Sequence, residues 1–170
     1  IAVTTDDSND EIVYASSMGD GVIQYKNGTP VQSYNEKNAF KETAGGYGSG
    51  YCYIDGLAFD KNGNLWMTSS EVNHAALVLD KAGAWHRLDI EQLRGVYTIN
   101  DILITSTNDK WIYVPRNTPK LVMIPNSESL DEVSSYEFTT LIDTDGKELT
   151  PSNYTCVAED KDGYIWVGTN

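Results

Sequence analysis

Three short acidic turns carry the side chains in this sequence best suited to binding a cation. They are Asp60–Gly63, Asp143–Gly146 and Asp160–Gly163, with the sequences DKNG, DTDG and DKDG. Spaced carboxylates are calcium ligands, but an EF-hand loop needs its glycine as the sixth residue, where the chain turns sharply. Here glycine is the fourth residue. Asp at the start of a turn, with Gly in the left-handed conformation, accounts for all three segments. We therefore predict structural turns and no metal.

The other residues with reactive side chains do not form a catalytic or metal-binding pattern. His74 and His86 are separated in the sequence and are not part of a Cys or Asp motif, whereas a zinc site needs three or four ligands. Adjacent acids such as Asp6-Asp7 point to opposite faces of a strand, which is poor geometry for sharing a proton. We expect no enzyme activity and no cofactor.

A glycine-rich segment, GGYGSG at 45–50, could suggest a loop that binds phosphate. It lacks the Lys-Ser/Thr ending of a P-loop, and no helix is predicted after it. It lies in a long connector, 35–52, where a mobile loop is the simpler interpretation. Long loops often carry function, so a binding loop with Tyr47, Tyr51 and Tyr53 as contact residues is the alternative.

The elements that would position these residues are β-hairpins that recur along the chain. Residues 154–170, YTCVAEDKDGYIWVGTN, contain two apolar runs around an Asp-Gly turn, which predicts a hairpin. Residues 54–70, IDGLAFDKNGNLWMTSS, repeat this pattern and align Trp66 with Trp166. Two weaker copies, 1–17 and 100–116, fit the same frame without gaps and place Val13 and Ile112 at the tryptophan position. A period of about 50 residues with several strands each is typical of propeller blades.

These motifs resemble the two-component regulator propeller repeat, in which a D-x-D/N-G turn precedes an aromatic strand ending in W-V-G-T. Residues 160–169 match it closely, and residues 60–70 match with Met67-Thr68-Ser69 in place of Val-Gly-Thr. Residues 138–169 are also similar to the PorZ-like surface propellers of type-nine secretion. The resemblance implies a propeller, usually seven-bladed, in a periplasmic or cell-surface sensor or scaffold. It implies no particular ligand.

The predicted fold is all-β: a fragment of about three and a half four-stranded blades. The whole of residues 1–170 forms one partial propeller. The expected blades are 1–35, 53–90, 99–142 and a half-blade at 153–170, with the long connector at 35–52. The half-blade would expose the strand of Trp166. We therefore expect that strand to be covered by the remaining blades of the same protein or by another subunit.

Composition excludes several classes of partner. The chain has 170 residues and a formal net charge of −13, from 25 acidic and 12 basic residues. Nucleic acid and anionic membrane surfaces both need a basic face, so neither is expected as a partner. No apolar run approaches the length of a membrane span, so no direct membrane insertion is expected in this segment.

Any ligand is expected on the face formed by the loops that join second to third strands and blade to blade. On that face Arg and Tyr side chains suit sugars and anionic groups. The ligand-binding candidates are Tyr47, Tyr51, Arg94, Tyr97, Arg116 and Asn117.

Three functions remain open. The first is a non-catalytic sensing module that binds an envelope glycan or other carbohydrate, and the second is a scaffold in an envelope or type-nine secretion assembly. The third is half of a propeller hydrolase or lyase, with its catalytic groups in other blades.

The two cysteines, Cys52 and Cys156, are expected to be free thiols. In the repeat frame one whole blade separates them, and a disulfide needs Cα atoms within about 7 Å of each other. Trp66 and Trp166 are expected to be packing residues, because their strands are apolar on both sides.

Overall fold

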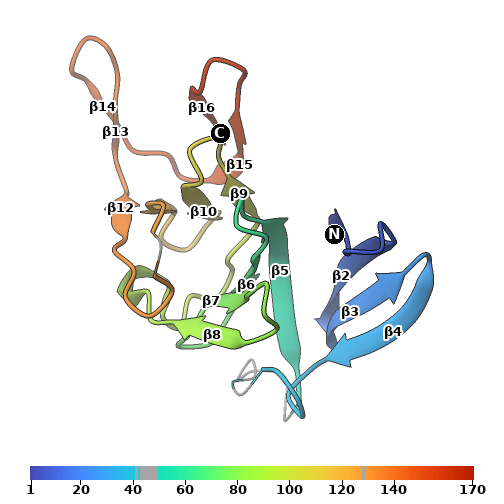
Figure 1. The fold of residues 1–170 in the computed structure, drawn as a ribbon. Coiled ribbons are helices and arrows are strands. Elements are labelled where there is room, and N and C mark those ends of the chain that lie inside the picture. The colour runs from blue at the N-terminus through green and yellow to red at the C-terminus, as the bar shows by residue number, and fades with distance from the viewer. Residues whose placement is uncertain (41, 43–49, 128) are drawn as a thin grey trace.

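Residues 1–40, 42, 50–127 and 129–170 are described by the computed structural model, whose regular structure is almost entirely β-strand. Sequential antiparallel strands form blades of four strands each (Figure 1). The first blade contains β1 (Ala2–Thr5), β2 (Glu11–Gly19), β3 (Gly21–Lys26) and β4 (Thr29–Tyr34). The second contains β5 (Cys52–Phe59), β6 (Leu65–Ser69), β7 (Ala76–Leu79) and β8 (Trp85–Leu88). The end of β2 pairs with the start of β5, so these two blades are joined in one eight-stranded sheet.

The third blade contains β9 (Ile102–Ile104), β10 (Lys110–Val114), β11 (Lys120–Ile124) and β12 (Tyr136–Phe138), and a 3₁₀ turn, η1 (Glu91–Leu93), precedes it. The last hairpin pairs β15 (Tyr154–Glu159) with β16 (Ile165–Thr169). The described chain is thus an arc of three four-stranded blades and the first two strands of a fourth. This confirms the predicted all-β propeller fold.

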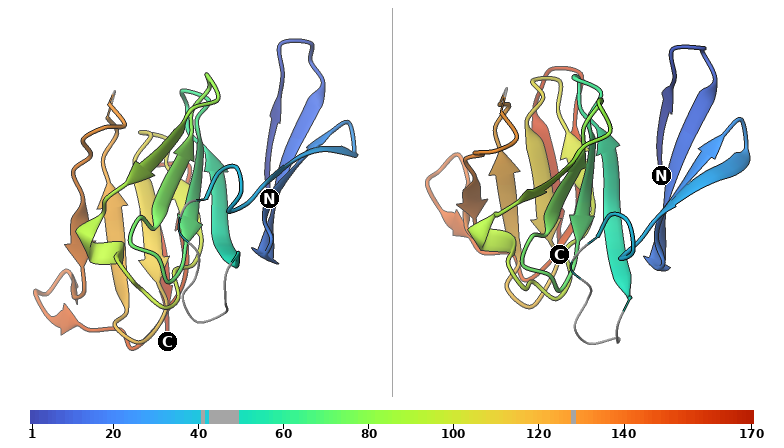
Figure 2. Two further views of the ribbon diagram at one scale, coloured as in Figure 1. Left: turned by 90° about the horizontal axis from the view of Figure 1, so that it is seen from below. Right: turned by 60° about the horizontal axis from the view of Figure 1, so that its bottom comes forward.

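Apolar side chains from neighbouring blades form the core, and the central strands of blades two and three are the most completely buried. One cluster joins blades one and two, and contains Tyr14, Val22, Leu57 and Met67. A second joins blades two and three, and a third joins blade three to the last hairpin. The blades fan out side by side in Figure 2. Packing therefore commits most strand side chains to contacts between blades.

The Asp-Gly segments are hydrogen-bonded turns, as predicted. In the turn of blade two, the Asp60 carboxylate accepts the backbone N–H groups of Asn62 and Asn64, both at 2.9 Å. Its second oxygen accepts the indole N–H of Trp66, also at 2.9 Å. Gly63 has a φ of 84°, a conformation in which a side chain would be strained. The carboxylate oxygens thus bind groups of the turn itself, which explains why Asp begins it.

The gap-free alignment of the two weaker copies is wrong by one residue. In blade three the turn runs from Thr105 to Asp109, and Asn108 holds the left-handed position with a φ of 70°. Trp111 pairs with Leu103 as Trp66 pairs with Ala58, so Trp111 rather than Ile112 is the equivalent of Trp66.

Blade one shows the same offset. Asn9 holds the left-handed position, with a φ of 62°, and Ile12 replaces Val13 as the equivalent residue, because it pairs with Thr4. Asn tolerates the left-handed conformation. The gap-free alignment instead matched Asp10 and Asp109, one residue further on, to the glycine of the turn.

The outer strand of the third blade is also shorter than predicted. It ends at Phe138, whereas the sequence pattern suggested a strand that continues to Leu141. Leu141 and Ile142 instead form β13 (Leu141–Ile142), which pairs with β14 (Glu148–Leu149) across the Asp143 turn. The turn chemistry of Asp143–Gly146 therefore produces an extra hairpin between blade three and the last hairpin.

Candidate functional site

The loop that joins the second and third strands of blade two lies against the connectors on either side of that blade. The backbone N–H of Glu71 donates to the carbonyl of Val96 at 2.8 Å, and Gly95 donates to Val72 at 2.9 Å. Asn73 donates to the carboxylate of Glu42, in the first connector, at 2.7 Å. For blade two these loops therefore share one face, where the sequence analysis placed the candidate site.

Two of the candidate residues gather around a third tyrosine on this face. The rings of Tyr51 and Tyr53 are 6.3 Å apart between centroids and tilted by 52°. Burial raises the pKa of Tyr53, the negative charge of Asp55 adds to the rise, and the hydroxyls of Tyr51 and Tyr97 are close enough to interact with it electrostatically. The side chain of Tyr97 is 58% exposed. The described part of this face therefore presents a tyrosine cluster: Tyr51, Tyr53 and Tyr97.

The other candidates lie apart from that cluster or lack a described position. Arg94 binds Asp89 through two hydrogen bonds, of 2.6 Å from Nε and 2.5 Å from Nη2, so a ligand would compete with that carboxylate. Arg116 and Asn117 are exposed in the β10–β11 loop, in the next blade of the arc. Tyr47 lies outside the described residues. Its role and the joint use of all six residues stay predictions.

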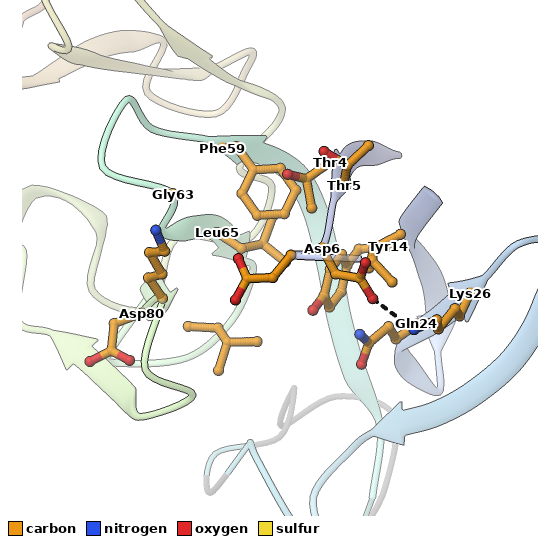
Figure 3. A pocket seen from close by; sticks show the side chains of 14 residues that line it. Thr4, Thr5, Asp6, Tyr14, Gln24, Lys26, Phe59, Gly63, Leu65 and Asp80 are labelled. Atoms are coloured by element: carbon orange, nitrogen blue, oxygen red, sulfur yellow. Dashed lines mark hydrogen bonds and ion pairs between the residues drawn. The ribbon is translucent and has the colours of Figure 1, made fainter. Parts of the chain in front are cut away.

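A cavity between blades one and two was not expected from the sequence (Figure 3). Its volume is about 580 Å³, within the range of ligand pockets. Tyr14 and Phe59 meet edge to face in its wall, with ring centroids 5.8 Å apart. At the rim, Lys26 forms ion pairs with Asp6 at 2.7 Å and Asp10 at 2.8 Å. The cavity depends on how two blades diverge, which no local sequence motif specifies.

A second, more polar cavity lies against the first strands of blades two and three. Its volume is about 340 Å³, and its lining includes Asp55, Asp101 and Tyr113. Burial raises the pKa of Asp55 to about 6, although the hydroxyl of Ser70 donates to its carboxylate at 2.8 Å. Asp101 adds to the rise through charge repulsion. Within the part of the chain that the structure describes, no group of three or more His, Cys, Asp or Glu side chains could hold a metal ion.

Comparisons with known proteins agree with this geometry. Residues 148–170 match the family model described as two component regulator propeller. No curated protein matches the chain. A solved structure of PorZ from Porphyromonas gingivalis superposes with a TM-score of 0.85 at 19% identity, covering 99% of this chain and 23% of PorZ. PorZ is described as an essential bacterial surface component of the type-IX secretion system. The similarity shows the propeller fold, and the chain spans less than a quarter of PorZ.

A second solved structure is more distant. It is the extracellular domain of BT3049 from B. thetaiotaomicron, a protein described as a hybrid two component system. It is 15% identical, with a TM-score of 0.36, and the alignment covers 99% of this chain and 31% of that one. A TM-score this low carries no argument about this chain.

Proposed function

We propose that this chain is a non-catalytic binding domain of a periplasmic or cell-surface protein, with its ligand site on the connector face. The tyrosine cluster is the observation that supports this proposal. Many strand side chains pack between blades, whereas Tyr97 is largely exposed and within electrostatic reach of Tyr53, whose ring lies near that of Tyr51. Tyr combines an apolar ring with a polar tip, a combination suited to a sugar. The match of residues 148–170 to the two component regulator propeller model supports a sensing role.

The proposed ligand is a glycan of the cell envelope. Arg116 is exposed on the neighbouring blade and could supply a forked donor to an anionic sugar. Arg94 could do the same only after exchanging its bond to Asp89, so it is the weaker of the two arginines. The description of PorZ as a bacterial surface component supports a location outside the cytoplasm. The described residues contain no helix of the length and apolarity needed to cross a membrane.

The first prediction tests this site with a panel of cell-envelope oligosaccharides measured by calorimetry. Tyr97→Ala should weaken binding about tenfold, since the loss of a single good contact costs roughly 1–2 kcal/mol. Arg94→Ala with Arg116→Ala should weaken binding by more than about tenfold at nearly unchanged thermal stability.

Tyr136→Ala is the matched control, because Tyr136 is 54% exposed but lies on the outer strand β12. Equal losses in Tyr97→Ala and Tyr136→Ala would remove the site assignment. Unchanged affinity in the double arginine variant would remove the arginines from it.

A scaffold role is the second candidate, supported by the description of PorZ as a component of a secretion system. A scaffold would bind no oligosaccharide of the panel but would co-purify with envelope proteins. In either role we propose that further blades of the same protein complete the ring. An exposed surface on the last hairpin supports this proposal, and its chemistry is developed next.

A further inference from the structure

The turn and tryptophan of blade two recur in the last hairpin with the same contacts. Asp160 accepts the indole N–H of Trp166 at 2.7 Å, as Asp60 accepts that of Trp66 at 2.9 Å. Trp166 pairs across the hairpin with Ala158, as Trp66 pairs with Ala58. The two tryptophans differ in exposure: Trp66 is 1% exposed, and Trp166 is 65% exposed. Their strands also differ, because β6 pairs with β5 and β7, whereas β16 pairs only with β15 among the described strands. The tryptophan of this turn-and-tryptophan unit is therefore buried in blade two and exposed to solvent in the last hairpin.

Trp66 is covered by its own blade, the connector after it, and the first two strands of the following blade. Ile102 and Ile112, which pair with each other, belong to the same buried cluster as Trp66. The ammonium of Lys110 lies 4.6 Å from the centroid of the indole ring, and Lys110 is only 1% exposed. A cation over an aromatic face is attractive, and the Asp60 carboxylate on the indole N–H adds negative charge nearby. The surface that fits this unit is thus aliphatic with one buried cation.

The turns of the two blades are also joined. The backbone N–H of Lys61 donates to the side-chain oxygen of Asn108 at 2.9 Å, and the Lys61 ammonium donates to the carbonyl of Ser106. In the last hairpin, Lys161 follows Asp160 as Lys61 follows Asp60, and its ammonium binds the neighbouring Asp162 at 2.8 Å. Lys61 joins blade two to blade three, and the last hairpin carries a lysine, Lys161, at the equivalent position of its turn.

We infer that the face of β15 and β16 around Trp166 is the docking surface for the first two strands of a further blade. That blade places a Lys or Arg side chain over the Trp166 indole, beside Asp160, and two β-branched residues next to it. A turn residue with a side-chain amide accepts the backbone N–H of Lys161. This inference deepens the proposed completion of the ring and does not depend on which ligand the connector face binds.

A second copy of this chain fits the surface poorly. Blade one leaves Val3 exposed on β1, so a second copy could dock through the open side of its blade one and bring that side onto Trp166. Glu11 follows the turn of blade one as Lys110 follows the turn of blade three, and the ladders pair Thr5 with Glu11 and Ile104 with Lys110. A second copy would therefore place a carboxylate over the indole, beside Asp160, where like charges repel. This favours a separate blade with a basic residue.

The test is hydroxyl-radical footprinting of the natural protein that contains these residues, compared with the 170-residue chain. Trp66 is the protected internal reference, and Tyr136 is the exposed one. In the isolated chain Trp166 should oxidise readily, and in the natural protein its oxidation should fall to the level of Trp66. The protected partner peptide should contain a Lys or Arg. Equal oxidation of Trp166 in both samples would overturn the docking surface, and a partner peptide without a basic residue would overturn its chemistry.

Two further measurements address the second copy and the charge. Footprinting of the isolated chain at rising concentration should leave Trp166 exposed, and protection that grows with concentration would show that a second copy is the occupant. In the chain itself, Lys110→Met should keep Trp66 protected, whereas Lys110→Glu should expose it to oxidation. If Lys110→Glu leaves Trp66 protected, the charge argument fails. None of these readouts uses a glycan, so their failure is separate from a failure of the proposed ligand.

Discussion

Single carboxylates in this chain differ in their chemistry because the groups around them differ. Asp160 binds an indole N–H and backbone amides, and these bonds hold the pKa of its carboxyl below the usual value. Asp55 lies against the inner strands with one hydroxyl donor and a neighbouring Asp101, and burial raises its pKa to about 6. The fold therefore favours the ionised form of Asp160 and works against that of Asp55.

The second prediction follows from the raised pKa of Asp55. Between the ordinary pKa of 3.8 and the folded value of about 6, the folded state binds more protons than the unfolded state. Stability contributed by this group is therefore lost as pH rises through that window. Asp55→Asn should raise the free energy of unfolding at pH 8 by about 1 kcal/mol, less than the full shift would give, because Asp55 is only partly buried.

The difference between Asp55→Asn and the original chain should vanish near pH 3.5, as measured by urea unfolding at each pH. Asp7→Asn is the control for loss of one negative charge, since Asp7 is an exposed turn residue. An Asp55→Asn protein that is no more stable than the original at pH 8 would contradict the prediction.

At the scale of elements, the same hairpin pattern occurs once with its tryptophan buried, in β5–β6, and once with its tryptophan exposed, in β15–β16. The hairpins of blade two and of β15–β16 share register, turn and the bond from indole to carboxylate. They differ in their neighbours: β6 also pairs with β7 and packs against blade three, whereas β16 pairs only with β15 among the described strands. The energetic value of the tryptophan therefore comes from the interface between blades rather than from the hairpin.

The third prediction compares the two tryptophans in the 170-residue chain. Trp66→Ala should lower the free energy of unfolding by about 3–5 kcal/mol, because it leaves a cavity beside Ile112 and Lys110. Trp166→Ala should cost less than about 1 kcal/mol, because an exposed ring leaves no cavity. Chemical denaturation of both variants gives the comparison. Similar losses of stability in the two variants would mean that the indole ring stabilises its own hairpin rather than the interface between blades.

At the scale of the whole molecule, blades keep distant residues apart. Cys52 is buried in the cluster between blades one and two, whereas Cys156 is exposed on the last hairpin, and both are free. This confirms the expectation of two unpaired thiols. Burial raises the pKa of Cys52 and so disfavours its reactive thiolate.

The fourth prediction is that a maleimide reagent labels one thiol in the native protein and two in denaturant. Cys156→Ser should abolish fast native labelling and leave one thiol that reacts only after unfolding. Mass spectrometry of the labelled protein, without reduction, gives the count. A linked peptide pair containing both cysteines would contradict the prediction.

Local patterns predicted the hairpins well where the turn contained glycine. The copies with Asn9 and Asn108 in the left-handed position were aligned one residue out of place, which assigned Ile112 to the role of Trp111. A turn pattern based on glycine cannot detect that substitution, because Asn adopts the same conformation with a side chain. The β13–β14 hairpin is the exception: its turn contains Gly146, but the hairpin was missed because its strands are only two residues long.

The sequence by itself determined the strand order, the Asp turns and the two-sided burial of Trp66, because these depend on local conformation and on the spacing of apolar residues. It also predicted a connector face with tyrosines. The tertiary structure alone decided that Arg94 is held by Asp89, that Tyr51 and Tyr97 lie near Tyr53, and that a cavity opens between blades one and two beside the cluster that joins them. It also decided that Trp166 is open. Those features depend on which blade lies beside which, and contacts between distant segments are not specified by local sequence patterns.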